Sequence, residues 1–382
     1  MTTSAARQAI PFFSAVWTWD DDAAAYVNRT LEARSPAGTS FAILESASDY
    51  LYLGSESRFD LAAFILDVDG VISNLTYEYS ITGNAWEQFI PGSTSYLAAE
   101  DDPPFSQYNF ANDGAEFFTY LSSWASRTFS DSNPHAATPP NETERYWIRI
   151  SASSITTSPT IRQILMRPYA AYCRATDVAN LLQLDADFSA TTVPTRDTVE
   201  DFIYAAQGLI DYKANESWRI SYQTNEYHEF NLAGSMLMKR PALRITKLEI
   251  WNGSDWQVKT QGRGQDFFLA PELNMFYWSR FFILPARFQS AGNTSGWLGG
   301  GEFLHPVRVS YLYGRTIDTD QEKGPIVFDI ARKMAAIDLY QNHDYSVLTI
   351  SGSDKVSLET KIRAWKDEID HKIESIISWM II

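Results

Sequence analysis

The sequence predicts an α+β protein of two domains, an antiparallel β-sandwich or jelly-roll-like domain at residues 1–172 and a helical domain with an inserted β-hairpin at residues 173–382. Short alternating apolar segments separated by turn residues fill the first part. Helix-start signals and apolar residues at helical spacing fill the second, and lysine is absent before Lys213. A chain of 382 residues also exceeds the usual size of one domain, which is roughly 100 to 200 residues.

Six segments of the first domain have the alternation, or the β-branched and aromatic content, of strands. They are Phe41 to Leu44, Tyr50 to Leu53, Phe64 to Val68, Leu75 to Ser80, Phe117 to Leu121 and Tyr146 to Ile150. Many short strands with turn residues between them indicate a sandwich or jelly roll. The stretch Thr82-Gly83-Asn84-Ala85 fits a hairpin turn, because Gly and Asn tolerate positive φ. Residues 155–168 are irregular, and we expect a linker near Pro159 to Tyr172.

Two short helices are expected between Arg174 and Tyr212. Thr176 precedes apolar residues at helical spacing, which marks a helix start. The second helix begins near Thr195, and acidic residues follow in its first turn, where negative charge favours the helix dipole. One apolar face of this second helix is expected to pack on the core, formed by Val199, Phe202, Ile203, Ala206, Leu209 and Ile210.

The β insertion is expected around residues 243–313. Leu243 to Trp251 alternates as a strand, and Asn252-Gly253-Ser254-Asp255 turns the chain back. Residues 285–303 are rich in Gly, Ser and Asn, which predicts a long loop. The alternating strand Val307 to Tyr313 closes the insertion and stops at Gly314.

After the insertion the chain runs through Pro325 into an amphipathic helix, and Lys355 to Trp379 predicts a long final helix. The C-terminus is unusually apolar, which predicts contact with a partner protein or a neighbouring subunit. The candidate interface residues are Ile373, Ile376, Ile377, Trp379, Met380, Ile381 and Ile382. Two alternatives stay open for the burial of this apolar segment: it can fold back on its own subunit, or it can enter a groove of another protein or a neighbouring subunit.

The order of these elements is two helices, a strand-rich insertion, a strand that ends in Tyr311-Leu312-Tyr313-Gly314, and helices again. It resembles the head-to-tail connector, or adaptor, proteins of tailed bacteriophages. The resemblance implies a structural protein of the virion that docks on the portal protein and joins it to the neck or tail. It also implies a ring of copies, most often twelve, that forms part of the DNA channel and inserts its C-terminal segment against the portal.

The first domain carries a second resemblance. Leu75 to Ser80, the Gly83 turn and Trp86 to Phe89, followed later by Glu144 to Ile150, resemble a β-domain common in phage virion proteins. There a hairpin with a Trp-bearing strand precedes a Tyr-Trp-Ile-Arg strand. An alternative function therefore stays open, a tail or capsid appendage whose sandwich binds carbohydrate.

The formal net charge of −16 and the pI near 4.7 argue against specific DNA binding, which needs clustered Lys and Arg. An acidic surface would let DNA pass without binding it. No stretch of about 18 apolar residues and no signal peptide is present, so we expect no membrane partner, synthesis in a host cytoplasm and a final location at the head-tail junction of a virion. The only cysteine, Cys173, excludes an internal disulfide.

The sharpest enzymatic pattern is Asp67-Val68-Asp69-Gly70-Val71 after an apolar strand, which resembles the first motif of haloacid-dehalogenase-type phosphatases. Such enzymes need a Lys and a further acidic pair downstream, but no Lys precedes Lys213. The same pair could begin a calcium loop, yet the twelfth position, Glu78, falls inside a predicted strand. The sequence therefore predicts no enzyme, catalytic residue, metal or cofactor. A phosphatase- or glycosidase-like hydrolase is the remaining alternative.

Overall fold

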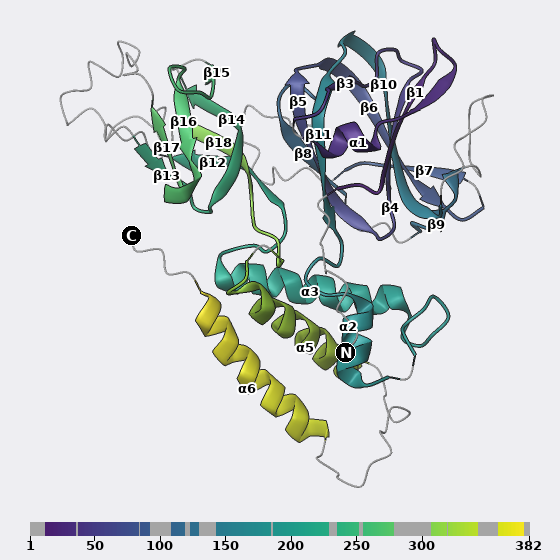
Figure 1. The fold of residues 1–382 in the computed structure, drawn as a ribbon, viewed down its shortest axis with the longest axis vertical. Helices are drawn as coiled ribbons and strands as arrows, with labels where there is room; N and C mark the ends of the chain where they lie inside the picture. Colours follow the sequence, from purple (N-terminus) through teal and green to yellow (C-terminus); the bar gives the residue numbers. More distant parts are fainter. Residues whose placement is uncertain are drawn as a thin grey trace, which may run out of the picture. The chain divides into compact units, whose positions relative to one another are not determined.

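The computed structural model describes residues 12–377 except 36, 84, 92–107, 119–122, 130–142, 185, 229–234, 252–254, 279–306, 319 and 343–357. The fold is α+β, and the chain divides into two compact units (Figure 1). A helical unit contains residues 1–11, 167–220 and 314–382, and a β unit contains residues 12–166 and 221–313. The insertion therefore groups with the N-terminal β region, although its place in the sequence predicted that it belongs to the C-terminal domain. Independent folding of residues 1–172 stays a prediction.

Two sheets build the N-terminal part of the β unit. The larger has seven strands in the order β2-β1-β4-β10-β6-β7, with β9 paired to β10, and the smaller has the order β3-β11-β5-β8. Strands of the larger sheet are β1 (Ala15–Asp20), β2 (Ala25–Asn28), β4 (Tyr50–Ser55), β6 (Val71–Ile81), β7 (Ala85–Phe89), β9 (Ser126–Arg127) and β10 (Arg145–Thr157). Those of the smaller sheet are β3 (Phe41–Ala42), β5 (Phe59–Val68), β8 (Gly114–Phe117) and β11 (Thr160–Pro168), and a short helix α1 (Thr30–Arg34) follows β2.

Alternation along β10 sets the two faces of the larger sheet. Ile148 and Ile150 point into a core that also contains Phe64 of the smaller sheet, whereas Trp147 belongs to a second aromatic cluster on the opposite face. A Cβ atom built on Gly54 would lie 2.5 Å from the Trp147 ring, so this cross-strand position admits only glycine. These features make the N-terminal part a sandwich, as the strand pattern predicted.

Two predictions for this region were wrong. Residues 160–168 are strand β11 and not a linker, because Ile161, Ile164 and Met166 are buried in the sandwich core. The strand expected from Phe117 to Leu121 ends at Phe117, and residues 119–122 lie outside the described residues. The prediction of a hairpin turn at residues 82–85 is confirmed, because β6 and β7 are antiparallel and Ile81 pairs with Ala85.

The insertion is larger than the predicted hairpin and consists of two further sheets. One has the order β12-β18-β14-β15 and the other β13-β17-β16. Their strands are β12 (Ser221–His228), β13 (Ser235–Leu237), β14 (Ala242–Trp251), β15 (Trp256–Val258), β16 (Phe267–Ala270), β17 (Met275–Trp278) and β18 (Val307–Tyr313), with a 3-10 turn η2 (Pro271–Leu273). The insertion begins at Ser221 and not near residue 243, because β12 pairs with β18 from Ser221 opposite Tyr313. The predicted loop 285–303 lies outside the described residues.

Four helices form the described core of the helical unit (Figure 1). They are α2 (Ala175–Leu182), α3 (Arg196–Ala214), α5 (Gly324–Asn342) and α6 (Leu358–Ile376). Helix α5 contacts the other three, and the Thr195 side chain caps α3 by accepting a hydrogen bond from Thr198 N at 3.3 Å, as its helix-start pattern predicted. In the described part of the chain, no helix is both long and apolar enough to span a membrane.

Candidate functional site

The end of α6 carries the candidate interface residues, and the structure divides them into two groups. Ile373 and Ile376 are buried in the core of their own helical unit, and Ile377 packs partly buried against the same core. Residues 378–382, which include Trp379, Met380, Ile381 and Ile382, lie outside the described residues. Contact with another protein stays a prediction, and it now concerns the residues after Ile376.

Lys323 binds the C-terminal end of α6. Its Nζ donates a hydrogen bond to the carbonyl oxygen of Ile376 at 3.1 Å, where a helix leaves carbonyl groups without partners and favours a positive charge. The same ammonium lies 3.2 Å from Glu216 Oε2, and Glu216 Oε1 lies 3.1 Å from Arg315 Nε. The point at which the chain leaves α6 is therefore fixed by charged contacts to two other segments.

The loop before α5 is ordered by Asp320. Its Oδ2 accepts a hydrogen bond from Trp218 Nε1 at 2.9 Å, and its Oδ1 accepts one from Lys323 N at 3.0 Å. Burial opposes the charge on Asp320, but these hydrogen bonds and the nearby Arg315 hold the pKa of its carboxyl below the ordinary value. An ionised Asp320 thus positions the backbone of Lys323, whose side chain caps α6.

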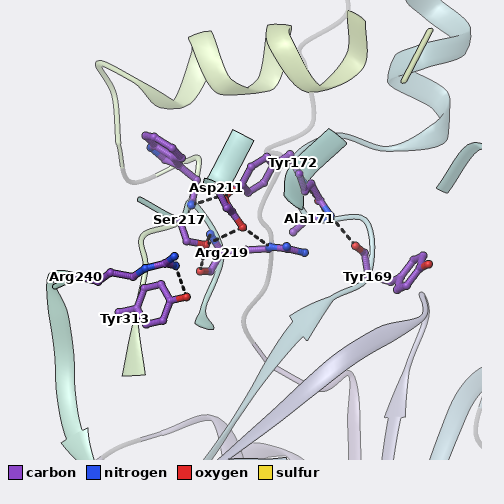
Figure 2. A network of polar contacts seen from close by, with 10 residues as sticks. Tyr169, Ala171, Tyr172, Asp211, Ser217, Arg219, Arg240 and Tyr313 are labelled. Atoms are coloured by element: carbon purple, nitrogen blue, oxygen red, sulfur yellow. Dashed lines mark hydrogen bonds and ion pairs between the residues drawn. The ribbon is translucent and has the colours of Figure 1, made fainter. Parts of the chain in front are cut away.

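A polar network on α3 holds the segments that enter and leave the helical unit (Figure 2). Gln207 is fully buried, accepts a hydrogen bond from Tyr172 N at 2.7 Å and donates one to Tyr169 O at 2.9 Å. One turn later, Asp211 accepts a hydrogen bond from the Tyr172 hydroxyl and lies 3.1 Å from Arg219 Nε. Buried backbone groups without hydrogen-bond partners are costly. Gln207 supplies such partners to the segment that enters the helical unit, at Tyr169 and Tyr172. Asp211 binds Arg219 in the segment that leaves the unit.

Gly314 sits where the chain returns from the insertion. Its φ is +106°, and a Cβ atom there would lie 2.1 Å from the carbonyl oxygen of Arg219. Arg315 N then donates a hydrogen bond to Ser217 O at 2.9 Å. The outgoing segment before Ser221 and the returning segment after Tyr313 are therefore in close backbone contact at the root of the insertion.

Charged side chains join α5 to α6. Asp329 Oδ2 lies 2.8 Å from Lys333 Nζ and 2.5 Å from Lys372 Nζ, and Glu368 Oε1 lies 2.6 Å from Lys333 Nζ. Burial would raise the pKa of Asp329, but the hydrogen bonds from Lys333, Lys372 and Arg332 outweigh burial and hold it well below the ordinary value. Helix α6 is consequently joined to α5 by charged contacts at Glu368 and Lys372 as well as by its apolar seam.

The phosphatase-like Asp pair lies at a corner between the two sheets of the sandwich. Asp67 is the last residue but one of β5 and is paired with Arg162, while Asp69 belongs to the two-residue connection to β6. Hydrogen bonds from Arg162 and Ser40 lower the pKa of Asp67, whereas burial and the charge of Asp113 raise that of Asp69. Within the described residues, no group of three or more His, Cys, Asp or Glu side chains could hold a metal ion. Absence of enzymatic activity stays a prediction.

Comparisons with known proteins give little beyond this geometry. No protein-family model and no curated protein matches the chain. Among solved structures, one match is a chain from the neck of an empty gene transfer agent (GTA) particle, computed with C6 symmetry. The match covers 56% of this chain and 93% of the GTA chain. The two share 12% sequence identity with a TM-score of 0.30. A TM-score this low does not show a common fold, so nothing about this chain is inferred from it.

Proposed function

We propose that this chain is the subunit of a ring-shaped head-to-tail connector in a tailed-phage particle, without catalytic activity. The observation that carries the proposal is the order of elements. Helices α2 and α3 precede a β insertion that leaves after Ile220 and returns at Gly314, and α5 and α6 then complete one shared core. This is the order on which the resemblance to connector proteins rests.

The proposed partners follow from the resemblance to connector proteins. A ring of twelve copies would dock on the portal protein, and the downstream face would contact a neck or tail protein. The C-terminal segment after Ile376 would be the anchor, which is supported by its apolar sequence and by the Lys323 contact that fixes where it begins. The surplus of acidic residues would let DNA pass through the ring without binding.

The mass of the assembled particle tests the proposal. Native mass spectrometry or negative-stain electron microscopy is applied to the purified chain, alone and mixed with the portal ring of the same particle. A closed ring, in solution or only on the portal, is the expected result. A chain that stays between monomer and tetramer and does not associate with the portal would overturn the proposal.

One observation favours a second candidate, a virion appendage that binds carbohydrate. Trp17, Tyr26, Tyr50 and Trp86 are partly buried on the face of the larger sheet that is opposite the core. Ligand sites are commonly lined by aromatic side chains with a few polar groups, and here Arg127 and Arg149 lie over the Trp86 ring, 4.3 and 4.6 Å from its centroid. Titration of the chain with saccharides from the host cell surface tests it, and Trp86→Ala should then abolish the binding. If no saccharide binds, the carbohydrate-binding candidate is wrong and the connector is the one remaining proposal.

A further inference from the structure

The insertion repeats the strand order of the N-terminal sandwich (Figure 1). The strands β4-β10-β6-β7 of the larger sandwich sheet correspond to β12-β18-β14-β15, and every neighbouring pair in both sets is antiparallel. In both, the chain visits a second sheet after the first strand and again after the hairpin, and β5 pairs with β8 as β13 pairs with β17. The two sheets of the insertion also share one core. The insertion is therefore a small sandwich in which the chain follows the same path.

A buried arginine occupies the same place in both central strands. Arg149 of β10 and Arg308 of β18 are 9% and 6% exposed, and each lies between two residues that point into the core of its sandwich. Each guanidinium is therefore on the face of its sheet that is opposite the core. The flanking core residues are Ile148, Ile150, Val307 and Val309.

The next strand supplies each arginine with a glutamate in register. Arg149 pairs with Glu78 of β6, and Arg308 pairs with Glu249 of β14. The distances from Nε to Oε2 are 2.6 and 2.5 Å, and those from Nη2 to Oε1 are 2.8 and 3.2 Å. Both contacts are thus two-pronged, which fixes the plane of the guanidinium as well as its position.

A tryptophan of the edge strand lies against each guanidinium. The Arg149 guanidinium is 4.6 Å from the centroid of the Trp86 ring in β7, and that of Arg308 is 4.3 Å from Trp256 in β15. Each tryptophan pairs in register with the residue two positions after the glutamate, Ser80 or Trp251. Both tryptophans are therefore diagonal neighbours of the glutamate on the same face.

A tyrosine stands on the other side of each arginine. Tyr52 of β4 is in register with Arg149, and Tyr227 of β12 is in register with Arg308. Four strands in the same spatial order thus carry Tyr, Arg, Glu and Trp at equivalent positions. Strand formation requires only side chains that suit a half-buried pleated surface, and burial of an ion pair carries a desolvation cost. Sheet formation alone therefore does not account for this recurrence.

We propose that the insertion is a second copy of the sandwich, and that the arginine of each copy holds the edge hairpin on its sheet. The guanidinium binds the first strand of the hairpin through the glutamate and the second strand through the indole ring. One side chain of the central strand thus contacts both strands of the hairpin, β6 and β7 in the first copy and β14 and β15 in the second. The inference goes beyond the proposed function, because it applies to a connector and to an appendage alike.

Hydrogen exchange followed by mass spectrometry tests the proposal on the full chain. Arg149→Lys and Arg308→Lys are made separately, because lysine keeps the charge but loses the planar fork. Arg149→Lys should speed amide exchange about tenfold or more in β6 and β7 and leave β14 and β15 as in the wild type, and Arg308→Lys should do the reverse. Arg162→Lys is the matched control, since this arginine of β11 pairs with Asp67 at 44% exposure, and it should leave both hairpins unchanged.

A milder pair of variants covers the case in which a lysine variant unfolds more than its hairpin, which exchange in α3 and α5 would reveal. Trp86→Phe and Trp256→Phe keep an aromatic ring but weaken the attraction for the guanidinium, so each should speed exchange of its own hairpin about twofold to tenfold. A response of one hairpin alone across both pairs of variants would show that the two copies are not equivalent and would overturn the inference. Wild-type exchange in both hairpins would overturn it as well.

Discussion

Lys323 donates a hydrogen bond from Nζ to the carbonyl oxygen of Ile376, the last residue of α6, at 3.1 Å. These residues are 53 positions apart in the chain. The same ammonium lies 3.2 Å from Glu216, which precedes the β insertion. One side chain thus connects the root of the insertion, the start of α5 and the end of α6, so the C-terminal segment begins from a fixed point.

The first prediction concerns this contact. Lys323→Met should lower the free energy of unfolding of the helical unit by about 1–3 kcal/mol, because it removes a charged hydrogen bond to a helix end and leaves the buried Glu216 with one partner fewer. Urea denaturation measures the change. Lys366→Met, at an exposed position of α6, should stay within about 0.5 kcal/mol of the wild type. Equal effects of the two variants would contradict a special role for Lys323.

The second prediction separates anchoring from folding. Deletion of residues 379–382 should leave the thermal midpoint unchanged and abolish assembly on the portal, because the core residues Ile373 and Ile376 are retained. Ile376→Ala is the matched comparison, and it should destabilise the monomer by about 2–5 kcal/mol because this side chain is fully buried. Calorimetry and co-sedimentation measure both. A truncated chain that still joins the portal would refute the anchor.

The third prediction concerns pH. Burial raises the pKa of Glu116 in β8 from 4.5 to about 8, although a hydrogen bond from Tyr108 N lowers it. The folded state then holds a proton that the unfolded state releases between these values. The contribution to stability is complete below about pH 4.5 and is lost as pH rises toward 8, at up to about 1.4 kcal/mol per pH unit.

Glu116→Gln should remove this dependence, because the amide is uncharged at every pH and keeps an acceptor for Tyr108 N. Unfolding is measured between pH 5 and pH 8 for both proteins. The variant's own pH profile supplies the contribution of all other groups. The variant should gain stability relative to the wild type as the pH rises, and a constant difference between the two would contradict the assignment.

The fourth prediction uses two glycines with positive φ. Gly314→Ala should cost at least about 3 kcal/mol, because its Cβ would lie 2.1 Å from Arg219 O at a φ of +106°. Gly83→Ala, at a φ of +77° with nothing within 4 Å, should cost only about 1–2 kcal/mol. Chemical denaturation compares them. Similar costs would show that the root of the insertion relaxes readily.

The fifth prediction concerns DNA. With a net charge of −16, the chain should not bind duplex DNA at physiological salt, because it offers little release of counterions. Fluorescence anisotropy with a labelled duplex at 50 mM and 150 mM salt checks this. Micromolar binding that weakens with salt would contradict an acidic channel surface.

Local chemistry alone predicted several elements. The strand Val307 to Tyr313 has the predicted bounds, and the Thr195 cap starts α3. Both depend on interactions within a few residues, an alternation that makes one strand face apolar and a hydroxyl that satisfies a helix end. The apolar seam of the last helix was also predicted correctly, since Ile369 and Ile373 are buried.

Tertiary structure decided the rest. Strand β12 has the polar sequence Ser-Tyr-Gln-Thr-Asn-Glu-Tyr-His and is a strand because β18 supplies its hydrogen-bond partners. No local pattern marks Lys323 as the cap of Ile376, or Gln207 as the partner of the chain entering the unit. These contacts join positions far apart in sequence, so they form only when packing brings the segments together. Leu209 of α3 was expected in the core but is 41% exposed for the same reason, since the sequence gives its periodicity but the neighbouring helices determine which face is covered.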